Sequence, residues 1–518
     1  MNTTEFLNIA VAICPDKTAT VFERKRYTFS QLNDRVNSLA NALSKLGVSK
    51  GDRVAILQVN CNQCVETYFA TAKLGAIYVP LNFRAKGDEL THMLNSAEAN
   101  TLFIGERYVD LANSLRPRLT SVKNFISIES FHDCMLYYEV LLLSSPAEEM
   151  VTEISDDDTT ILLFTAGTTG LPKGVMLSHN SFAVYVLENV TPADPESEEG
   201  NILTVPLYHV AGIQAMMAAI YGGRTLVMER QFEPVEWMEL VETENINRAM
   251  MVPTMLKQLM DHPDFSKHNL SSLKVITYGA APMPLEVIKK AVDIFPEANF
   301  INAFGQTETA STITTLGPED HNITGTEEEK EKKLRRLSSI GKPMPDVEMR
   351  IIDEEGHELP LGEVGEIVAR GPRVMTGYWK DEEKTEKTLD KEGWVHTSDM
   401  GYVDEDGYFF LAGRATDMII RGGENISPEE VEIVLQSHTK VDECAVIGVP
   451  DEEWGEVPMC MVVLKEGETC SPEELIEHCR AKLASYKRPR SVVFCEELPR
   501  NPMGKVLKRV LREQYGKD

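Results

Sequence analysis

Apolar and polar positions follow two different periods along the first part of the chain. Residues 28–47 repeat apolar side chains at helical spacing, with Ser30 as the expected N-terminal cap and Gly47 at the end. The apolar face of this predicted helix comprises Leu32, Val36, Leu39, Leu43 and Leu46. Helical patterns and short apolar, strand-like runs then alternate: helices near 62–74 and 87–97, strands at 52–57, 77–80 and 101–104. This alternation predicts stacked βα units around a mostly parallel sheet.

The alternation returns after a less regular stretch at 131–158. The run Ile161-Leu162-Leu163 reads as a strand, and Ser178 can cap a helix over 179–189. Later elements continue the series: strands at 203–205, 249–252 and 275–278, and helices near 234–245 and 254–261. Residues 318–338 are rich in charge and predict an exposed loop, whereas glycine- and aspartate-punctuated strands over 340–412 predict a β-rich subdomain.

The last hundred residues read as a separate small α+β domain. Ser471-Pro472-Glu473-Glu474 is a capping box with proline at the first helical position, which opens a helix to about 484. A second helix is predicted over 428–435, and the strands lie near 443–449, 457–464 and 490–495. The whole pattern predicts an α/β fold: a large N-terminal domain of stacked βαβ subdomains plus a β-rich subdomain, and a small α+β C-terminal domain.

Composition narrows the class of protein. The chain has 518 residues, which favours two or more domains, and a net charge of −29, which disfavours nucleic acid and anionic membranes as partners. No apolar run is long enough for a membrane span, and the N-terminus lacks the basic start of a signal peptide. Nine cysteines, an odd number, indicate reduced thiols and a cytoplasmic location. Cys61 and Cys64 form a C-x-x-C without a matching second pair, so zinc is not expected there.

The stretch from Phe164 to Gly174 is the strongest candidate for chemistry. This stretch follows a predicted strand and contains glycines, threonines and a lysine. Exposed backbone N–H groups, threonine hydroxyls and a lysine are the groups that bind a polyphosphate. Its spacing is neither that of a Walker loop nor that of a dinucleotide fingerprint. Val175-Met176-Leu177 follows instead of a helix, which suggests a flexible clamp on phosphates. The alternative is a surface turn between two strands.

This loop resembles the signature of the adenylate-forming enzymes, which include acyl- and aryl-CoA synthetases, luciferases and peptide-synthetase adenylation domains. Further stretches follow in the family's order and extend the resemblance over essentially the whole chain. They are Pro15-Asp16-Lys17, Tyr278-Gly279-Ala280-Ala281-Pro282, Asn302-Ala303-Phe304-Gly305-Gln306-Thr307-Glu308, Gly365-Glu366, Gly377-Tyr378-Trp379, Gly393 to Asp399, Gly413-Arg414, Arg421-Gly422-Gly423-Glu424-Asn425-Ile426 and Asn501-Pro502-Met503-Gly504-Lys505.

The resemblance implies an AMP-forming acyl-CoA ligase that uses ATP, Mg²⁺ and CoA. A carboxylic acid would be activated as an acyl-adenylate, and a thiol would then displace AMP. It implies an adenylation domain over 1–413, a hinge at 414–417 and a mobile C-terminal domain over 418–518. The family's hinge residue falls at Thr416 here, with Asp417 next, so either can be the hinge. A homodimer is compatible with this interpretation.

By resemblance, the nucleotide site has a defined set of residues. It comprises Thr165, Ala166, Gly167, Thr168, Thr169, Gly170, Lys173, Gly279, Ala280, Ala281, Pro282, Asn302, Ala303, Phe304, Gly305, Gln306, Thr307, Asp399, Arg414 and Lys505. Beside this set, Glu308 would hold Mg²⁺. Within the set, Thr307 would bind the α-phosphate and Asp399 the ribose, while Ala280-Ala281-Pro282 and Phe304 would enclose adenine. Phe304 replaces the family's usual tyrosine. Lys505 would bridge the carboxylate and the α-phosphate. The alternatives are a helix start at Thr307-Glu308, an Asx-turn at Asp399 and a solvated Lys505.

The acyl and thiol sites are also implied by resemblance. The acyl pocket would comprise His209, Val210, Gly212, Ile213, Met251, Tyr278, Gly279, Ala303, Phe304 and Gly305. Acetate-specific members have tryptophan where Gly305 stands, so an open floor is expected. No cation is evident in this set, which favours an apolar monocarboxylic acid: medium-chain, aromatic or alicyclic. His209 would gate the thiol tunnel, unless it is a packed histidine. Arg421, Gly422, Gly423 and Glu424 would line the path of CoA.

Two alternatives remain beside the ligase interpretation. The acceptor can be the thiol of a separate carrier protein, which would make the chain an acyl-AMP ligase that loads this carrier. A degenerate nucleotide-binding or scaffold protein is a non-enzymatic alternative. The latter predicts loss of Glu308, Asp399 or Lys505, and all three are present.

Overall fold

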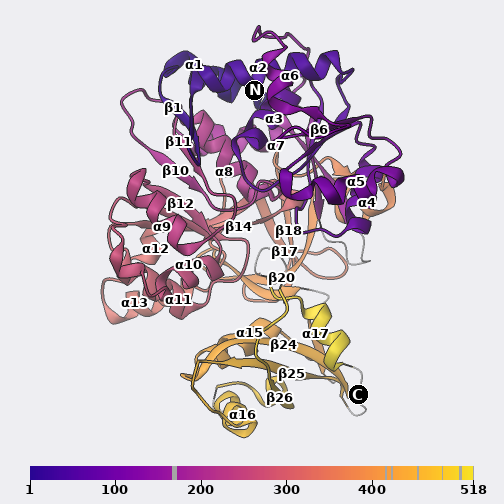
Figure 1. The fold of residues 1–518 in the computed structure, drawn as a ribbon. Coiled ribbons are helices and arrows are strands. Elements are labelled where there is room, and N and C mark those ends of the chain that lie inside the picture. The colour runs from indigo at the N-terminus through magenta and orange to yellow at the C-terminus, as the bar shows by residue number, and fades with distance from the viewer. Residues whose placement is uncertain are drawn as a thin grey trace.

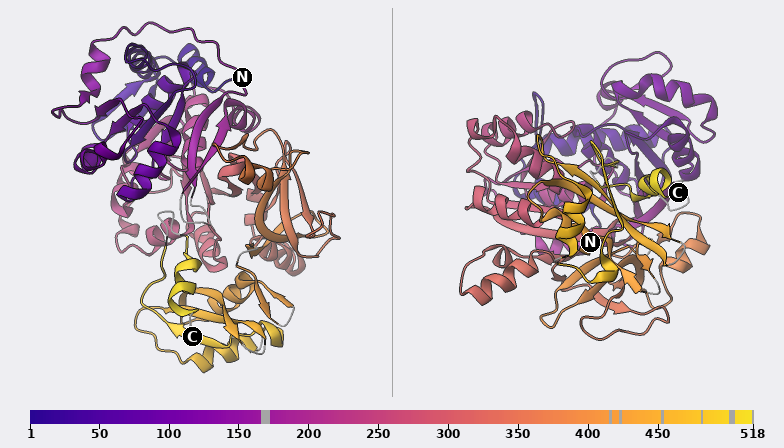
Figure 2. Two further views of the ribbon diagram at one scale, coloured as in Figure 1. Left: turned by 90° about the vertical axis from the view of Figure 1, so that its right-hand side faces the viewer. Right: turned by 90° about the horizontal axis from the view of Figure 1, so that it is seen from below.

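A computed structural model describes the chain at residues 1–165, 172–414, 417–421, 424–451, 454–480, 482–500 and 505–516, with only the backbone at 414, 424 and 425. Two bodies are visible in Figure 1 and in the left view of Figure 2: a large one with the N-terminus, and a smaller one formed by the last part of the chain. The α/β fold class predicted from the sequence is confirmed.

Two broad sheets form the large body. The first has the order β19 (Gly377–Tyr378), β9 (Lys173–Ser178), β8 (Thr159–Thr165), β4 (Ile77–Pro80), β3 (Arg53–Leu57), β5 (Thr101–Ile104), β6 (Asn124–Ser127) and β7 (Leu136–Tyr137). The second has the order β16 (Lys342–Pro343), β15 (Ser311–Leu316), β14 (Asn299–Gln306), β13 (Val275–Gly279), β12 (Arg248–Met251), β10 (Gly200–Leu203), β11 (Thr225–Met228), β1 (Thr18–Phe22) and β2 (Lys25–Thr28). Pairing is parallel through β8-β4-β3-β5-β6-β7 and from β14 to β1, as the alternation predicted.

Helices cover these sheets and enclose several hydrophobic cores. In chain order they are α1 (Thr4–Ile13), α2 (Phe29–Lys45), α3 (Asn62–Lys73), α4 (Gly87–Ala97), α5 (Val109–Leu115), α6 (Tyr138–Leu143), α7 (His179–Asn189), α8 (Val210–Tyr221), α9 (Pro234–Thr243), α10 (Pro253–Asp261) and α11 (Leu285–Ile294). The first core joins α1–α3, α7 and α8 to strands of both sheets. The second, which we call the rear core, packs α9–α11 against β12, β13 and β14. None of the described helices is both long and apolar enough to cross a bilayer.

Two smaller sheets complete the fold. A β-rich subdomain has the order β17 (Glu348–Ile352), β18 (Gly365–Arg370), β20 (Val395–Val403) and β21 (Phe409–Arg414), accompanied by α14 (Glu382–Thr388). The smaller body has the order β23 (Glu424–Ile426), β22 (Ile419–Arg421), β25 (Gly455–Leu464) and β24 (Val441–Asp451), with β26 (Ser491–Phe494) on β25. Its helices are α15 (Pro428–Gln436), α16 (Pro472–Arg480) and α17 (Lys508–Tyr515). The helix predicted to about 484 is described as α16 as far as Arg480; residue 481 lies outside the described part of the chain, and beyond it Leu483 N–H donates to Cys479 O.

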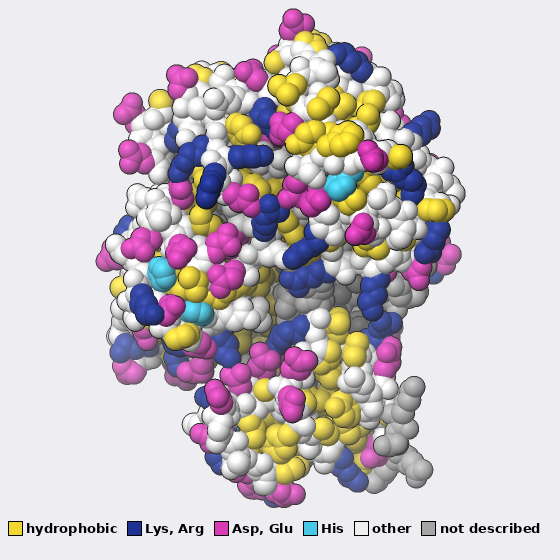
Figure 3. Space-filling view, viewed as in Figure 1, with side chains coloured by type: hydrophobic (Ala, Val, Ile, Leu, Met, Phe, Trp, Pro, Cys, Tyr) yellow, Lys and Arg dark blue, Asp and Glu magenta, His cyan; other side chains and the backbone are white. Residues whose placement is uncertain are grey.

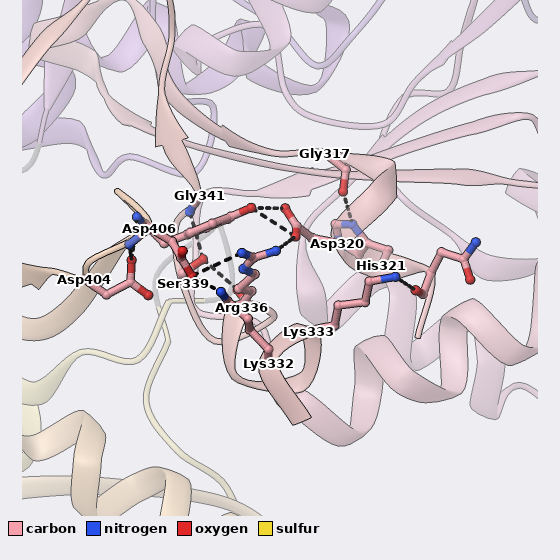
Figure 4. Close-up of polar contacts among 12 residues, drawn as sticks. Gly317, Asp320, His321, Lys332, Lys333, Arg336, Ser339, Gly341, Asp404 and Asp406 are labelled. Carbon is pink, nitrogen blue, oxygen red and sulfur yellow. Dashed lines mark hydrogen bonds and ion pairs between the residues drawn. The ribbon is translucent and has the colours of Figure 1, made fainter. Parts of the chain in front are cut away.

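The predicted exposed loop at 318–338 is wrong. This segment forms α12 (Pro318–His321) and α13 (Glu327–Arg336). Thr326 and Glu329 make a reciprocal capping box, and acidic residues in the first turn with basic residues in the last complement the helix dipole. Ion pairs from Arg336 to Asp320 and Asp406 then fasten α13 to the molecule (Figure 4). Charge patterning, not apolar periodicity, specifies this helix.

Two smaller sequence predictions also need correction. Thr28, not Ser30, caps α2, because its extended backbone lets Thr28 and Gln31 bond reciprocally; Gly47 follows the helix end with φ of +85°. The strand expected at 203–205 is β10, which begins three residues earlier at Gly200, pairs with β11 and ends at Leu203. Thr204, just beyond it, accepts the Trp237 indole hydrogen bond at 3.0 Å.

Candidate active site

The predicted phosphate loop lies, in sequence, between the two strands of a β-hairpin. Strands β8 and β9 pair antiparallel, and their last pair joins Thr165 to Lys173. The predicted residues Ala166, Gly167, Thr168, Thr169 and Gly170 lie outside the described part of the chain. Trp379 N–H donates to Gly174 O at 2.8 Å, so the edge strand β19 fixes the hairpin beside the loop.

Glu308 lies next to this hairpin. It belongs to a single 3₁₀ turn, Thr307–Thr309, that follows β14. Tyr378 donates its hydroxyl to Glu308 Oε1 at 2.8 Å, and Met375 N–H donates to Glu308 O at 2.8 Å. Glu308 also acts on Lys173: burial and Lys384 lower the pKa of Lys173, whereas Asp381 and Glu308 oppose this shift. The fold thus brings Lys173 and Glu308, both predicted to act on the phosphates, close enough for their charges to interact.

Tyr378 is a residue of this site to which the sequence assigned no role. Its backbone pairs with Val175 of β9, while its hydroxyl reaches the carboxylate of Glu308. Burial and the charge of Glu308 raise the pKa of Tyr378, which keeps the phenol protonated as a hydrogen-bond donor. The tyrosine of the Gly377-Tyr378-Trp379 motif was the available signal, but its partner became visible only through the strand pairing.

Asp399 and Gln306 meet on the nucleotide side. Gln306 donates from Nε2 to Asp399 Oδ2 at 2.6 Å and to Thr397 O at 2.9 Å. Asp399 lies on β20, is 7% exposed, and pairs through its backbone with Arg414 on β21. The predicted ribose carboxylate is therefore held by a predicted nucleotide residue from another sheet, close to Thr307.

The predicted adenine residues lie at the ends of two neighbouring parallel strands. Gly279 pairs with Ala303, and a Cβ on Gly279 would lie 2.1 Å from Ala303 O, so only glycine fits there. Ala280 has a left-handed backbone with φ of +65° and is exposed together with Pro282, while Ala281 is half-buried. Asn302 donates to Ser339 O at 3.3 Å, and Phe304 packs partly buried against apolar residues of the β-rich subdomain.

His209 stands at the N-terminus of α8 in apolar surroundings. Burial lowers the pKa of His209 to about 4, so the imidazole is neutral at physiological pH. Its Nδ1 has no hydrogen-bond partner among the described residues. Val210 and Ile213 are buried in the first core, and a Cβ on Gly212 would meet Pro206 O at 2.4 Å. A half-buried, neutral imidazole whose Nδ1 has no partner among the described residues is suited to meet a ligand.

Met251 and Tyr278 point away from this imidazole. Both side chains belong to the rear core, and Tyr278 Oη lies 2.8 Å from His321 Nε2. Because side chains alternate along a strand, Met250 faces the opposite side. Met250 packs with Val205, Ala211 and Val252, and Ala211 lies two residues after His209 in the chain. The side chains of Met251 and Tyr278, which the sequence predicts in the acyl pocket, therefore pack into the rear core, whereas Met250 lies on the opposite face of β12.

Gly305 is more constrained than the sequence suggested. A β-bulge separates Phe304 from Gly305, and a Cβ on Gly305 would lie 1.4 Å from Ser311 O. Any side chain at this position requires the backbone of β15 to move. Gly305 marks a tight backbone contact, so its lack of a side chain says little by itself about the depth of a pocket.

The C-terminal candidates belong to the smaller body. Lys505 is exposed, directly after 501–504, which lie outside the described residues. Arg421 packs over the ring of Trp454 and donates to Tyr486 O at 2.8 Å. Gly422, Gly423 and the hinge candidate Thr416 lie outside the described residues, as does the side chain of Glu424. Asp417, the other hinge candidate, pairs with Arg512 of α17 at 2.6 Å.

Charge is distributed unevenly over the surface. Figure 3 shows acidic and basic side chains spread over the visible face, with several basic side chains near the place where the two bodies meet. In a chain with a net charge of −29, such local positive charge provides the attraction that an anionic ligand needs.

Comparisons with known proteins agree with this geometry. Residues 8–379 match the family described as AMP-binding enzyme, and residues 430–505 match its C-terminal domain. The chain is 33% identical to an indoleacetate–CoA ligase of Aromatoleum aromaticum over 99% of this chain and 98% of that protein. It is 33% identical to the fatty acid–[acyl-carrier-protein] ligase ScoC of Streptomyces coeruleorubidus over 97% of this chain and 94% of that protein. The crystal structure of the anthranilate CoA ligase AuaEII with anthranoyl-AMP superposes with a TM-score of 0.90 at 28% identity, covering 99% of this chain and 97% of that one. A match over most of the chain, joined to the arrangement of Lys173, Glu308 and Asp399, shows that the chain belongs to the AMP-binding enzymes, the adenylate-forming family.

Proposed function

We propose that this protein is an AMP-forming acyl-CoA ligase for an apolar monocarboxylic acid, medium-chain, aromatic or alicyclic. A carboxylate oxygen attacks the α-phosphorus of ATP, the bond to the bridging oxygen breaks, and pyrophosphate leaves. The sulfur of CoA then attacks the acyl carbonyl, and AMP leaves with the bonding pair. The convergence of Lys173, Glu308 and Tyr378 beside the hairpin is the observation that best supports this reaction.

The residues suit a reaction that places negative charge on phosphate oxygens. Lys173 supplies a partly desolvated cation at the end of the hairpin, and Thr307 supplies a hydroxyl next to it. The partly exposed carboxylate of Glu308 offers the hard oxygen that Mg²⁺ prefers, and bound Mg²⁺ would neutralise charge on the phosphates. Asp399 offers its carboxylate to the ribose hydroxyls. We assign Lys505 to the oxygens of the carboxylate and the α-phosphate, and the Arg421–Glu424 segment to the path of CoA.

The apolar surroundings of His209 support an apolar acid. Val205, Ala211, Val252 and Met250 form a small apolar cluster, Ala211 lies two residues after His209, and the imidazole is neutral. The described residues of this cluster include no cation that could pair with a second carboxylate. The indoleacetate and anthranilate ligases among the similar proteins have names that agree with an aromatic acid. Transfer to a carrier-protein thiol is the second candidate, which the similarity to ScoC favours.

We also propose that the domains divide at 414–417 and that the C-terminal domain changes orientation between the two steps. This requires Lys505 in the first step and the Arg421–Glu424 segment in the second. The ion pair between Asp417 and Arg512 would then lie at the pivot.

A pyrophosphate-release screen over acids of graded size, with and without CoA, tests the function. Apolar monocarboxylic acids should release pyrophosphate, and thioester should form only with CoA. Lys505→Ala should abolish adenylate formation yet spare thioester formation from supplied acyl-adenylate. Arg509→Ala is the matched control, because Arg509 is an exposed cation on the adjoining helix. Equal loss of both half-reactions would reject the role of Lys505, and thioester on a carrier protein but not on CoA would favour the second candidate.

A further inference from the structure

A cluster of side chains of the kinds that can bind a metal lies in the smaller body, and none of its members is assigned to the reaction. His438 follows α15, Cys470 precedes α16, and Glu474 lies in the first turn of α16. One donor atom from each of these residues lies within 4.8 Å of the others. His438 Nε2 is 3.5 Å from Glu474 Oε1. We propose that His438, Cys470 and Glu474 form a binding site for a zinc-class divalent ion.

The donor types favour zinc over magnesium. A thiolate, an imidazole and a carboxylate are the ligands of tetrahedral Zn²⁺, whereas Mg²⁺ prefers six oxygens. Bond lengths of about 2.0–2.3 Å place tetrahedral ligands about 3.5 Å apart. The observed separations therefore need only small side-chain rotations. The Glu474 side chain is 40% exposed, so water can reach the fourth position.

Neighbouring groups already hold the imidazole of His438 in place. The rings of His438 and His478 meet edge to face with centroids 4.9 Å apart. His478 Nε2 lies 3.1 Å from Val434 O and 3.0 Å from Ser437 Oγ, which fixes this ring against α15. The His438 side chain is only 12% exposed. A ligand that is ordered before the ion arrives loses less entropy on binding.

Lys440 competes for the same carboxylate. Its Nζ lies 2.8 Å from Glu474 Oε1 and 3.1 Å from Oε2. An ordinary surface ion pair is the alternative interpretation of the cluster. The two interpretations predict opposite roles for Lys440, because a bound divalent cation repels the ammonium group. Removal of Lys440 therefore tightens a metal site.

The test uses the reduced, metal-free full chain. Zn²⁺ affinity is measured by competition with a chromophoric chelator, and Co²⁺ serves as a probe because thiolate ligation gives a near-ultraviolet charge-transfer band. Wild type should bind one equivalent and show the band. Cys470→Ser should lose the band and weaken Zn²⁺ binding about 100-fold or more, since even outer-shell changes weaken metal sites 10- to 100-fold. His438→Gln should weaken binding yet keep the band at higher Co²⁺.

Two further variants make the result decisive. Cys134→Ser, at an exposed cysteine in the other body, should behave as wild type. Lys440→Met should bind Zn²⁺ about 5-fold more tightly, as expected from removing an opposing surface charge. Urea unfolding midpoints verify that each variant is folded. Absence of the band in folded wild type, its persistence in Cys470→Ser, or weaker Zn²⁺ binding by Lys440→Met would overturn the proposal.

Discussion

Tyr378 joins three parts of the candidate site at the level of a single residue. Its backbone continues the sheet beyond β9, its amide donates to Thr385 Oγ1 at 2.9 Å, and its hydroxyl orients Glu308. The residue therefore acts as a positioning group, with Glu308 as the group that would contact the metal. This arrangement couples the direction of one carboxylate to the edge of the sheet that holds the phosphate hairpin.

We predict that Tyr378→Phe weakens metal binding without changing the fold. The substitution removes only the oxygen that holds Glu308, and a hydrogen bond to a charged group is worth about 1.5–3 kcal/mol, or roughly 10- to 100-fold. Electron paramagnetic resonance of Mn²⁺, with a non-hydrolysable ATP analogue present, measures this affinity directly. Tyr402→Phe is the control, since Tyr402 stacks on Phe410 with ring centroids 4.9 Å apart. Unchanged Mn²⁺ affinity would remove Tyr378 from the metal-positioning role.

Glu229 is a buried acid that the proposed reaction does not use. It follows β11, is 1% exposed, and its Oε1 has no hydrogen-bond partner among the described residues. Burial raises the pKa of Glu229 to about 9. Between pH 4.5 and 9 the folded state therefore holds a proton that the unfolded state has lost, so stability falls as pH rises through this window.

Glu229→Gln should remove this pH dependence. The linked slope is at most about 1.4 kcal/mol per pH unit, so the advantage of the glutamine variant should grow steadily from pH 5 to pH 8. Urea unfolding at several pH values measures it. Glu239→Gln, at an exposed site on α9, provides the control. Parallel stability curves for wild type and Glu229→Gln would contradict a protonated Glu229.

At the level of elements, α13 illustrates how a helix can be missed. The segment has no apolar stripe, and none of its residues is buried. Its stability comes from the capping box at Thr326, from oppositely charged ends and from Arg336, which reaches two aspartates outside the helix. A search for apolar periodicity cannot detect such a helix, although the Thr-x-x-Glu signature was present in the sequence.

Thr326→Ala should loosen α13 alone. The loss of an N-terminal cap costs about 1 kcal/mol, which corresponds to roughly 5-fold faster amide exchange in the first turn. Hydrogen exchange resolved by residue would show this at Glu329 and Lys330, whose amides bond to Thr326. Thr324→Ala is a matched control outside the helix. Equal exchange in wild type and Thr326→Ala would show that the cap contributes nothing.

Most strands and helices of the two broad sheets could be predicted because they have a periodic apolar side. Which side chains of β12 and β13 enter the rear core could not, because both faces are apolar and only the tertiary packing separates them. Tyr278 illustrates this, since its partner His321 lies on α12, in a segment predicted to be a loop. Likewise, the pairing of Gln306 with Asp399 joins strands of different sheets, and no local pattern specifies such a contact.

At the level of the whole molecule, an ion pair joins the two bodies on the side of α10. Lys257 of α10 pairs with Asp442 of β24 at 2.7 Å, beside a cavity of about 510 Å³ that both bodies line. Both side chains are about one-third exposed, at 33% and 30%. A pair of this kind contributes at most about 1 kcal/mol, so it can bias the orientation of the smaller body without locking it.

Lys257→Met should therefore change the balance between the two proposed half-reactions. If the C-terminal domain reorients, this pair forms in only one orientation, and its loss should shift the ratio of adenylation to thioester formation by up to about 5-fold. The ratio is measured with each half-reaction assayed separately. Lys290→Met is a matched control, because Lys290 lines the same cavity but pairs with Asp261 within the large body. An unchanged ratio in Lys257→Met would show that the contact does not discriminate between orientations.

Gly305 has a consequence for how such an enzyme can change its substrate. Because a first carbon at this position collides with the backbone of Ser311, no single codon change can insert a bulky plug there and leave β15 undisturbed. A mutational route toward shorter acids would pass through a misfolded or strained intermediate unless β15 changed first. Met250, whose side chain packs with Val205, Ala211 and Val252 on the other face of β12, offers a one-step route instead under the proposed function. Libraries built to alter acid preference should therefore begin at Met250, and lineages that acquire a side chain at 305 should be found to have altered β15 beforehand.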